Sequence, residues 1–133
     1  FLIGTPIGDI GVIAATERDG RPQDDIAHLS MRFHDGSTAV VHYLANGSAA
    51  FPKERVEAFA DGRVWQIENW RRLKVLGGRG GQGHRFSRME KGHRAELATF
   101  AESVSTGAPA PIPYDELFEV SRWSIRAAEM ARR

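Results

Sequence analysis

Cysteine is absent from the 133 residues of the sequence, which excludes a disulfide framework and a thiolate nucleophile. A chain without disulfides fits a reducing compartment, and we expect a cytoplasmic protein. Net charge is also small, because 18 Lys and Arg residues against 17 Asp and Glu residues give +1. Proteins that bind the phosphate backbone usually carry a strong basic excess, so we expect no nucleic-acid partner. No apolar run approaches the roughly 20 residues that cross a bilayer, and we expect no membrane partner.

The remaining composition is that of a folded protein. Hydrophobic residues make up 41% and charged residues 26%, which excludes wholesale disorder, and the length predicts a single domain over residues 1–133. The chain begins at Phe1 rather than Met, so we expect it to be a piece of a longer protein.

Residues 10–76 alternate between apolar and polar positions, which indicates strands. Asp35-Gly36 is the sequence of a two-residue type I′ turn, in which both central residues take positive φ. This turn places Leu29 opposite His42 and His28 opposite Tyr43, so His28 and His42 lie on opposite faces. The buried face then consists of Ala27, Leu29, Met31, Phe33, Val40, His42 and Leu44.

A second turn of the same kind is predicted at Asp61-Gly62. It sets Val56 opposite Ile67 and Arg55 opposite Glu68, a cross-strand ion pair worth about 0.2–1 kcal/mol. A further strand follows at residues 71–76. Together these segments predict one open, mostly antiparallel sheet of about five or six strands.

Two helices follow the strands. Residues 93–105 carry a stripe of Leu97, Phe100, Ala101 and Val104, and Gly107 ends the helix. The second helix runs from about Asp115 to the C-terminus, with a small-residue face of Leu117, Val120, Ser121, Ser124, Ala128 and Ala131. We expect both helices to pack on one face of the sheet, which is an α+β architecture.

The glycine-rich residues 78–83 match the dinucleotide-binding pattern G-x-G-x-x-G. That pattern works only where a strand leads into a helix within a βαβ unit, and Gly92 interrupts any helix beginning at His84. A surface loop is therefore predicted, and a loop that orders over a ligand or a partner stays open. RNA binding through Arg-Gly-Gly is disfavoured, because one copy occurs without interleaved aromatics.

The histidines and acids form no predicted catalytic or metal site. Zinc needs three or four converging ligands, and His34, His84 and His93 are scattered along the chain. His42 is interpreted as a histidine at the boundary between sheet and helix. No pair of carboxylates suggests a general acid and base. We predict no catalytic residue and no metal ligand in this chain.

Residues 43–54 join two strands and are too long for a tight turn. Phe51 and Lys53 belong to no apolar stripe, and long connections with an aromatic and a cation often hold ligand contacts. The alternative is a solvated connection with Phe51 tucked into the core.

Two parts of the chain resemble a known family. Residues 92–104, followed by Thr106-Gly107 and residues 114–129, resemble the closing helices of the Gfo/Idh/MocA oxidoreductases. Residues 42–71 (HYLANGSAAFPKERVEAFADGRVWQIENWR) resemble central strands of the family's second domain. The resemblance implies a C-terminal domain like those of dihydrodipicolinate reductase and glyceraldehyde-3-phosphate dehydrogenase.

The family resemblance implies that the cofactor and catalytic groups lie elsewhere. A Rossmann domain upstream would hold NAD or NADP and a catalytic lysine, and residues 1–4 look like the end of a helix that bears a catalytic His and Asp. This chain would hold no cofactor and would be inactive alone.

The resemblance implies that the chain is the substrate-binding and oligomerisation domain of a sugar or polyol dehydrogenase. It implies contacts with a small sugar-like substrate at Ser48, Phe51 and Lys53, and less directly at His84 and Arg85. It also implies a homo-oligomer, with Ala39, Val41 and Tyr43 at the interface on the face away from the helices. The alternative is a domain of the same fold that serves only assembly or protein contact.

Overall fold

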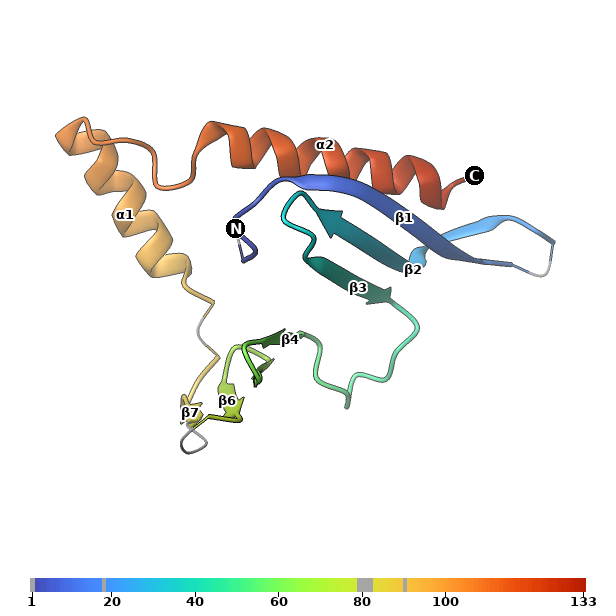
Figure 1. The fold of residues 1–133 in the computed structure, drawn as a ribbon, viewed down its shortest axis with the longest axis horizontal. Helices are drawn as coiled ribbons and strands as arrows, with labels where there is room; N and C mark the ends of the chain where they lie inside the picture. The colour runs from blue at the N-terminus through green and yellow to red at the C-terminus, as the bar shows by residue number, and fades with distance from the viewer. Residues whose placement is uncertain (1, 18, 79–82, 90) are drawn as a thin grey trace. The chain divides into compact units, whose positions relative to one another are not determined.

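The computed structural model describes residues 2–17, 19–78, 83–89 and 91–133, and it has the expected α+β composition (Figure 1). Its contacts divide the chain into two compact units, Phe1–Gly47 with Gly107–Arg133, and Ser48–Thr106. Residues 2–6 form no helix, and the assignment of residues 1–4 to the end of an upstream helix stays a prediction. The elements are β1 (Ile7–Thr16), β2 (Pro22–Phe33), β3 (Thr38–Leu44), β4 (Arg55–Ala60), β5 (Arg63–Glu68), β6 (Arg72–Leu76), β7 (Gly83–Arg85), α1 (His93–Thr106) and α2 (Tyr114–Ala131).

The first unit is an antiparallel sheet of β1, β2 and β3 with α2 packed on it. The turn between β2 and β3 is not the predicted type I′ turn, because Gly36 has φ 87° and Asp35 has no positive φ. Phe33 N donates to Ser37 O, so the loop holds three residues rather than two. The pairing is therefore shifted by one residue from the prediction.

This shift moves every β3 side chain to the other face of the sheet. Leu29 pairs with Val41 and Ala27 with Tyr43, in the same rows as Val12 and Ala14 of β1. Ala27 is 3% exposed and Ile10 8%, and α2 contacts the strands that carry them. The predicted placement of Ala39, Val41 and Tyr43 on the face away from the helices is wrong. The residues on that far face are Val40, His42 and Leu44, which were predicted to be buried.

Helix α2 buries only part of its predicted face. Ala131 of that face is buried, together with Ala127, which lies one turn away and outside it, and their small side chains allow a close approach. Leu117 and Val120 of the predicted face stay 47% and 58% exposed. The Glu119 carboxylate accepts a hydrogen bond of 2.6 Å from Ile7 N, which ties the helix to the start of β1.

The second unit contains an antiparallel sheet in the order β4-β5-β6-β7. Asp61 and Gly62 both have positive φ, 49° and 68°, so the predicted type I′ turn is confirmed. The predicted pairs Val56 with Ile67 and Arg55 with Glu68 are confirmed as well. The ion pair of Arg55 differs, because its guanidinium lies 2.5 Å from Glu57 on the same strand.

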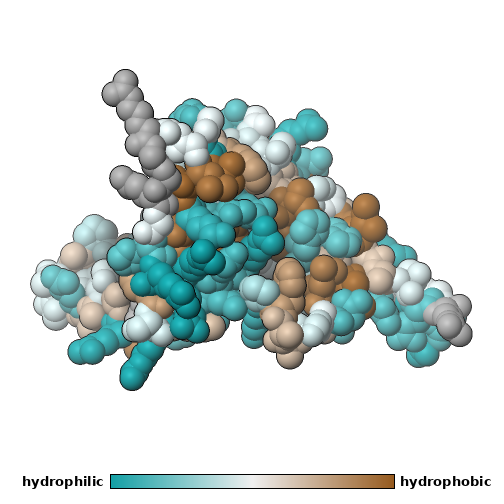
Figure 2. Space-filling view, turned by 90° about the horizontal axis from the view of Figure 1, so that it is seen from below, coloured by the Kyte–Doolittle hydropathy of each residue, from teal (hydrophilic) through white to brown (hydrophobic). Residues whose placement is uncertain are grey.

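The single sheet expected from the sequence is wrong, because the described strands form two sheets of three and four strands. Helix α1 has the predicted bounds within one residue and is followed by Gly107 with φ 70°. Within its own unit α1 does not pack on the described strands, and Leu97, Phe100 and Val104 are 69%, 58% and 69% exposed. Figure 2 shows hydrophobic side chains at the molecular surface. The predicted packing of the helices on a sheet is therefore confirmed only for α2.

Candidate functional site

The predicted substrate loop is a short turn with outward side chains. Ser48 Oγ accepts a hydrogen bond of 3.2 Å from Ala50 N, and Phe51 N donates to Ser48 O at 3.0 Å. Phe51 is 63% exposed, so its placement in the core is wrong. Lys53 is exposed as well. An exposed ring and an exposed ammonium two residues apart can contact a ligand without any rearrangement of a core.

Glu54, which the sequence did not single out, holds the end of this loop. Its backbone N donates to Asn69 Oδ1 at 3.1 Å, and its backbone O accepts from Asn69 N at 2.7 Å. Its Oε1 lies 2.8 Å from Lys91 Nζ. These contacts join the loop to the turn between β5 and β6 and to the segment before α1. The predicted register of β4 and β5 places Asn69 opposite Glu54, but isolated charges carry no signal for the contact with Lys91, which lies 37 residues away.

The Glu54 carboxylate is kept ionised by its surroundings. The hydrogen bond from Lys91 lowers the pKa of Glu54 most strongly, and partial burial opposes that effect. The charges of Lys91 and Lys53 lower the pKa further. The indole of Trp70 adds to the lowering, although it does not reach ordinary hydrogen-bond geometry with the buried Oε2. An ionised Glu54 preserves the ion pair that holds the loop.

The pairing of Glu54 and Lys91 makes the second unit sensitive to acid. Because the folded-state pKa of Glu54 lies below its usual 4.5, its stabilising contribution is present above 4.5 and is lost as pH falls through the folded value. We expect the urea midpoint to fall more steeply in wild type than in Glu54→Gln between pH 5 and the folded-state pKa of Glu54. Parallel curves for the two proteins would contradict this assignment.

The turn between β5 and β6, in which Asn69 binds the backbone of Glu54, is strained. Asn69 and Trp70 have φ of 48° and 52°, and neither is glycine. Asparagine tolerates this conformation, whereas a bulky residue such as Trp70 pays about 1–3 kcal/mol for it. Arg71 N donates to Glu68 O and Phe86 N donates to Arg71 O, so the turn is fixed from both sides. Such strain persists only where the surroundings over-determine it, which makes this turn a candidate functional element.

His84 and Arg85 lie on β7, opposite Leu73 and Arg72 of β6. Adjacent strand residues point to opposite faces, so only one of the two can face a ligand bound on a given side. His84 packs its ring edge against Phe86, with ring centroids 4.6 Å apart. Among the described residues, no hydrogen bond or ion pair joins either side chain to Ser48, Phe51 or Lys53. The substrate roles of all five residues stay predictions.

The glycine-rich motif has no dinucleotide-binding geometry in its described part. Gly78 follows β6 and Gly83 begins β7, and these two strands are antiparallel neighbours. The four central residues, 79–82, lie outside the described residues. Gly78 and Gly83 thus lie at the ends of two antiparallel strands, and the absence of dinucleotide binding stays a prediction.

The predicted separation of two histidines is wrong. His28 pairs with His42 across β2 and β3, and their Nδ1 atoms lie 2.6 Å apart. Both rings are exposed, so His42 is not at a boundary between sheet and helix. No group of three or more metal-ligating side chains is found within the described ranges.

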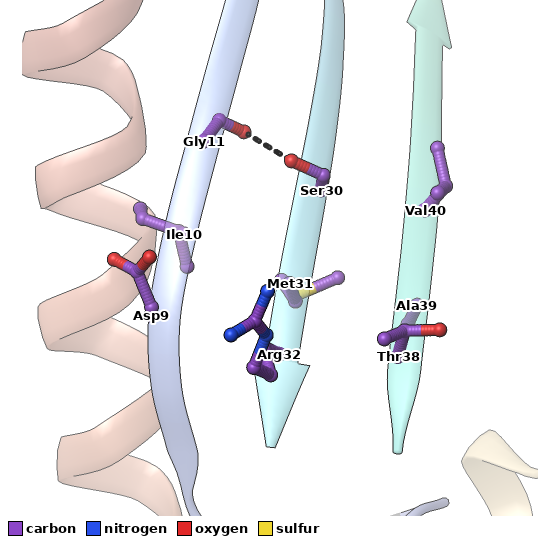
Figure 3. A pocket seen from close by; sticks show the side chains of 9 residues that line it. All are labelled: Asp9, Ile10, Gly11, Ser30, Met31, Arg32, Thr38, Ala39 and Val40. Carbon is purple, nitrogen blue, oxygen red and sulfur yellow. Dashed lines mark hydrogen bonds between the residues drawn. The ribbon is translucent and has the colours of Figure 1, made fainter. Parts of the chain in front are cut away.

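A shallow pocket of about 200 Å³ lies on the first unit, across its three strands (Figure 3). Gly11 leaves room there, because a Cβ on it would lie 2.9 Å from Ser30 Oγ. Ser30 Oγ donates to Gly11 O at 3.4 Å (Figure 3). None of the predicted substrate residues lines this pocket, which includes Asp9, Arg32 and Thr38.

Comparison with known proteins identifies the fold. No family model and no curated protein matches the chain. One solved structure is similar, UDP-N-acetylglucosamine 3-dehydrogenase GnnA from Acidithiobacillus ferrooxidans, with a TM-score of 0.68 and 15% identity. The chain shares the fold of part of that enzyme. The match covers 98% of this chain and 45% of that one, so the chain spans less than half of the dehydrogenase. In the part of the chain that the structure describes, neither helix is long and apolar enough to cross a membrane.

Proposed function

We propose that this chain is the substrate-binding and oligomerisation domain of an NAD(P)-dependent oxidoreductase that acts on a sugar or polyol. The observation that carries the proposal is the structural likeness of nearly the whole chain to part of a dehydrogenase of a sugar nucleotide. Sequence resemblance to the Gfo/Idh/MocA oxidoreductases supports the same assignment. In this proposal the Rossmann domain, with NAD or NADP, precedes the chain in a cytoplasmic protein.

Ser48, Phe51 and Lys53 supply the chemistry that a sugar requires. An exposed aromatic ring packs against the C–H face of a pyranose, and an ammonium donates to a hydroxyl, a carboxylate or a phosphate. The contacts of Glu54 with Asn69 and Lys91 hold the loop that carries Phe51 and Lys53 at a defined place on the second unit. Hydride transfer needs the substrate held against the nicotinamide, so a pinned loop contributes through orientation.

Because the proposal places the cofactor in the upstream Rossmann domain, we expect that the chain alone does not bind NADH. Calorimetric titration of the isolated chain with NADH should give no heat of binding, because the cofactor groups lie outside it. The longer protein that contains the chain should bind NADH and reduce NAD or NADP with a sugar or polyol, measured at 340 nm. Micromolar NADH binding by the chain alone would contradict the proposal, as would a longer protein without any cofactor affinity.

Self-association is expected through β3, which is an edge strand of its sheet. Val41 and Tyr43 are 44% and 58% exposed there, and a second copy of the chain would cover them. Light scattering at about 100 μM should report a dimer or larger, and Tyr43→Asp should give a monomer. Phe59→Asp, at a 72% exposed residue of the second unit, is the matched control and should leave the assembly intact. A monomeric wild-type chain at that concentration would refute this interface.

The alternative of a domain used only for assembly is favoured by one observation. The stripe of Leu97, Phe100 and Val104 on α1 stays exposed, which is typical of a surface that another chain or domain covers. A protein that assembles but shows no dehydrogenase activity with any sugar or polyol, and no affinity for NAD or NADP, would establish this alternative.

A further inference from the structure

Two histidines from neighbouring strands converge on the open face of the first sheet. His28 of β2 and His42 of β3 are direct cross-strand partners, and their rings meet edge to face at 77° with centroids 4.8 Å apart. Their Nδ1 atoms are 2.6 Å apart. Both side chains lie on the side of the sheet opposite Ala27, which α2 covers, so solvent reaches them.

The contact brings two possible ligand atoms together. Nδ1 of His28 lies 2.6 Å from Nδ1 of His42, and the tautomers decide which of the two donates. Imidazole nitrogen is a common ligand of transition metals, so a metal ion can replace this contact when both rings turn toward it.

We propose that His28 and His42 form a bidentate site for a divalent transition metal of tetragonal geometry, Cu²⁺ or Ni²⁺. Metal–nitrogen bonds of about 2.0–2.1 Å place two ligands about 2.9 Å apart at 90° and about 3.3 Å apart in a tetrahedron. The pair has to open by about 0.3 to 0.7 Å, and both rings turn toward the ion, for either geometry. Two imidazole ligands with water in the other positions suit Cu²⁺ and Ni²⁺, because zinc sites usually use three or four protein ligands.

The surroundings leave the rest of the coordination sphere open. Ile13 faces His28 from β1, and Ser30 and Val40 follow in the next row of the same face. Asp9 and Arg32 are charged residues of this face. They are cross-strand neighbours in β1 and β2 and lie two rows from the histidines. No third histidine or carboxylate within the described ranges joins the pair. Water or a small external ligand fills the remaining positions, so the ion exchanges readily.

The test is a calorimetric titration of the whole chain with NiCl₂, CuCl₂ and ZnCl₂ in a non-chelating buffer at pH 7.5. We expect one ion per chain, with tighter binding of Cu²⁺ and Ni²⁺ than of Zn²⁺. His28→Ala and His42→Ala should each weaken Ni²⁺ binding at least about tenfold, because one ligand remains of two. The control variants His34→Ala and His84→Ala should bind as wild type does, with circular dichroism verifying that every variant is folded.

Two further measurements separate this site from adventitious binding. Lowering the pH from 7.5 to 5.5 should weaken Ni²⁺ binding, because protons compete with the metal for the imidazole nitrogens. The spectrum of the Cu²⁺ complex should show two coordinated nitrogens in wild type and fewer in His42→Ala. No binding at millimolar Ni²⁺, or equal binding by wild type and both alanine variants, would overturn the proposal. Tighter binding of Zn²⁺ than of Ni²⁺ would overturn the tetragonal geometry.

Discussion

We expect replacement of Lys53 by alanine to lower kcat/KM of the proposed longer dehydrogenase for its sugar substrate about ten- to a hundred-fold. A charge-assisted hydrogen bond is worth about 1.5–3 kcal/mol, and about 1.4 kcal/mol corresponds to a factor of ten. Lys53 is exposed, so its removal should change the free energy of unfolding by less than about 0.5 kcal/mol. Cofactor affinity should stay the same, because the nicotinamide site belongs to the other domain of the proposal.

The matched control for Lys53 is Lys91, the lysine that binds Glu54. Lys91→Ala removes an anchor of the loop and should lower stability together with kcat/KM, whereas Lys53→Ala should lower kcat/KM alone. Steady-state kinetics and urea unfolding of both variants distinguish the two roles. An unchanged kcat/KM in Lys53→Ala would remove this lysine from the substrate site, and a large loss of stability would make it structural.

Replacement of Asn69 by alanine should cost the second unit about 2–4 kcal/mol of unfolding free energy. The variant loses the Oδ1 acceptor of Glu54 N and places a residue with a Cβ, but without a side-chain hydrogen bond, at φ 48°. Glu54 N then lies part-buried without its partner, which adds a desolvation penalty to the lost hydrogen bond. Urea unfolding of the chain measures the difference.

Two companion variants divide this effect into its causes. Asn69→Gly accepts positive φ but lacks the acceptor, so it should lose less stability than the alanine variant. Asn69→Asp keeps an acceptor oxygen and should lose least. If the alanine variant unfolds at the same urea concentration as wild type, neither the strained turn nor the Glu54 anchor holds the loop.

The two Asp-Gly turns show when a turn sequence predicts the register of its strands and when it does not. At Asp61-Gly62 the flanking strands alternate cleanly, with Val56 and Ile67 on one face, so turn chemistry and hydrophobic pattern select the same register. At Asp35-Gly36 the returning strand, residues 38–44, is apolar on both faces. Its pattern therefore tolerates two registers that differ by one residue, and the three-residue turn forms instead of the two-residue one.

The candidate site shows the same division between local and distant causes. Residues 48–53 were recognisable as a loop that carries an aromatic and a cation, and they are exposed as a loop of that kind requires. The contact of Glu54 with Asn69 continues the predicted register of β4 and β5, one step beyond the pair of Arg55 with Glu68. The contact with Lys91 was not recognisable, because it joins residues 37 positions apart that no local pattern connects. The meeting of His28 and His42 depends in the same way on a register that the turn sequence alone did not select.

By itself the sequence determined the six strands β1–β6 and both helices, with α1, α2 and the second hairpin near their observed bounds, but it did not predict β7. Those features depend on periodicity, glycine and turn chemistry within a few residues of each other. The tertiary structure decided the division into two sheets, the face to which Val41 and Tyr43 belong, and the side of α2 that packs. In α2 the predicted small-residue face and the buried residues share Ala131, and Ala127 joins it where the helix packs on β1 and β2. Small side chains allow a close approach there, so the strands that the helix meets, and not its own pattern alone, select the side that packs.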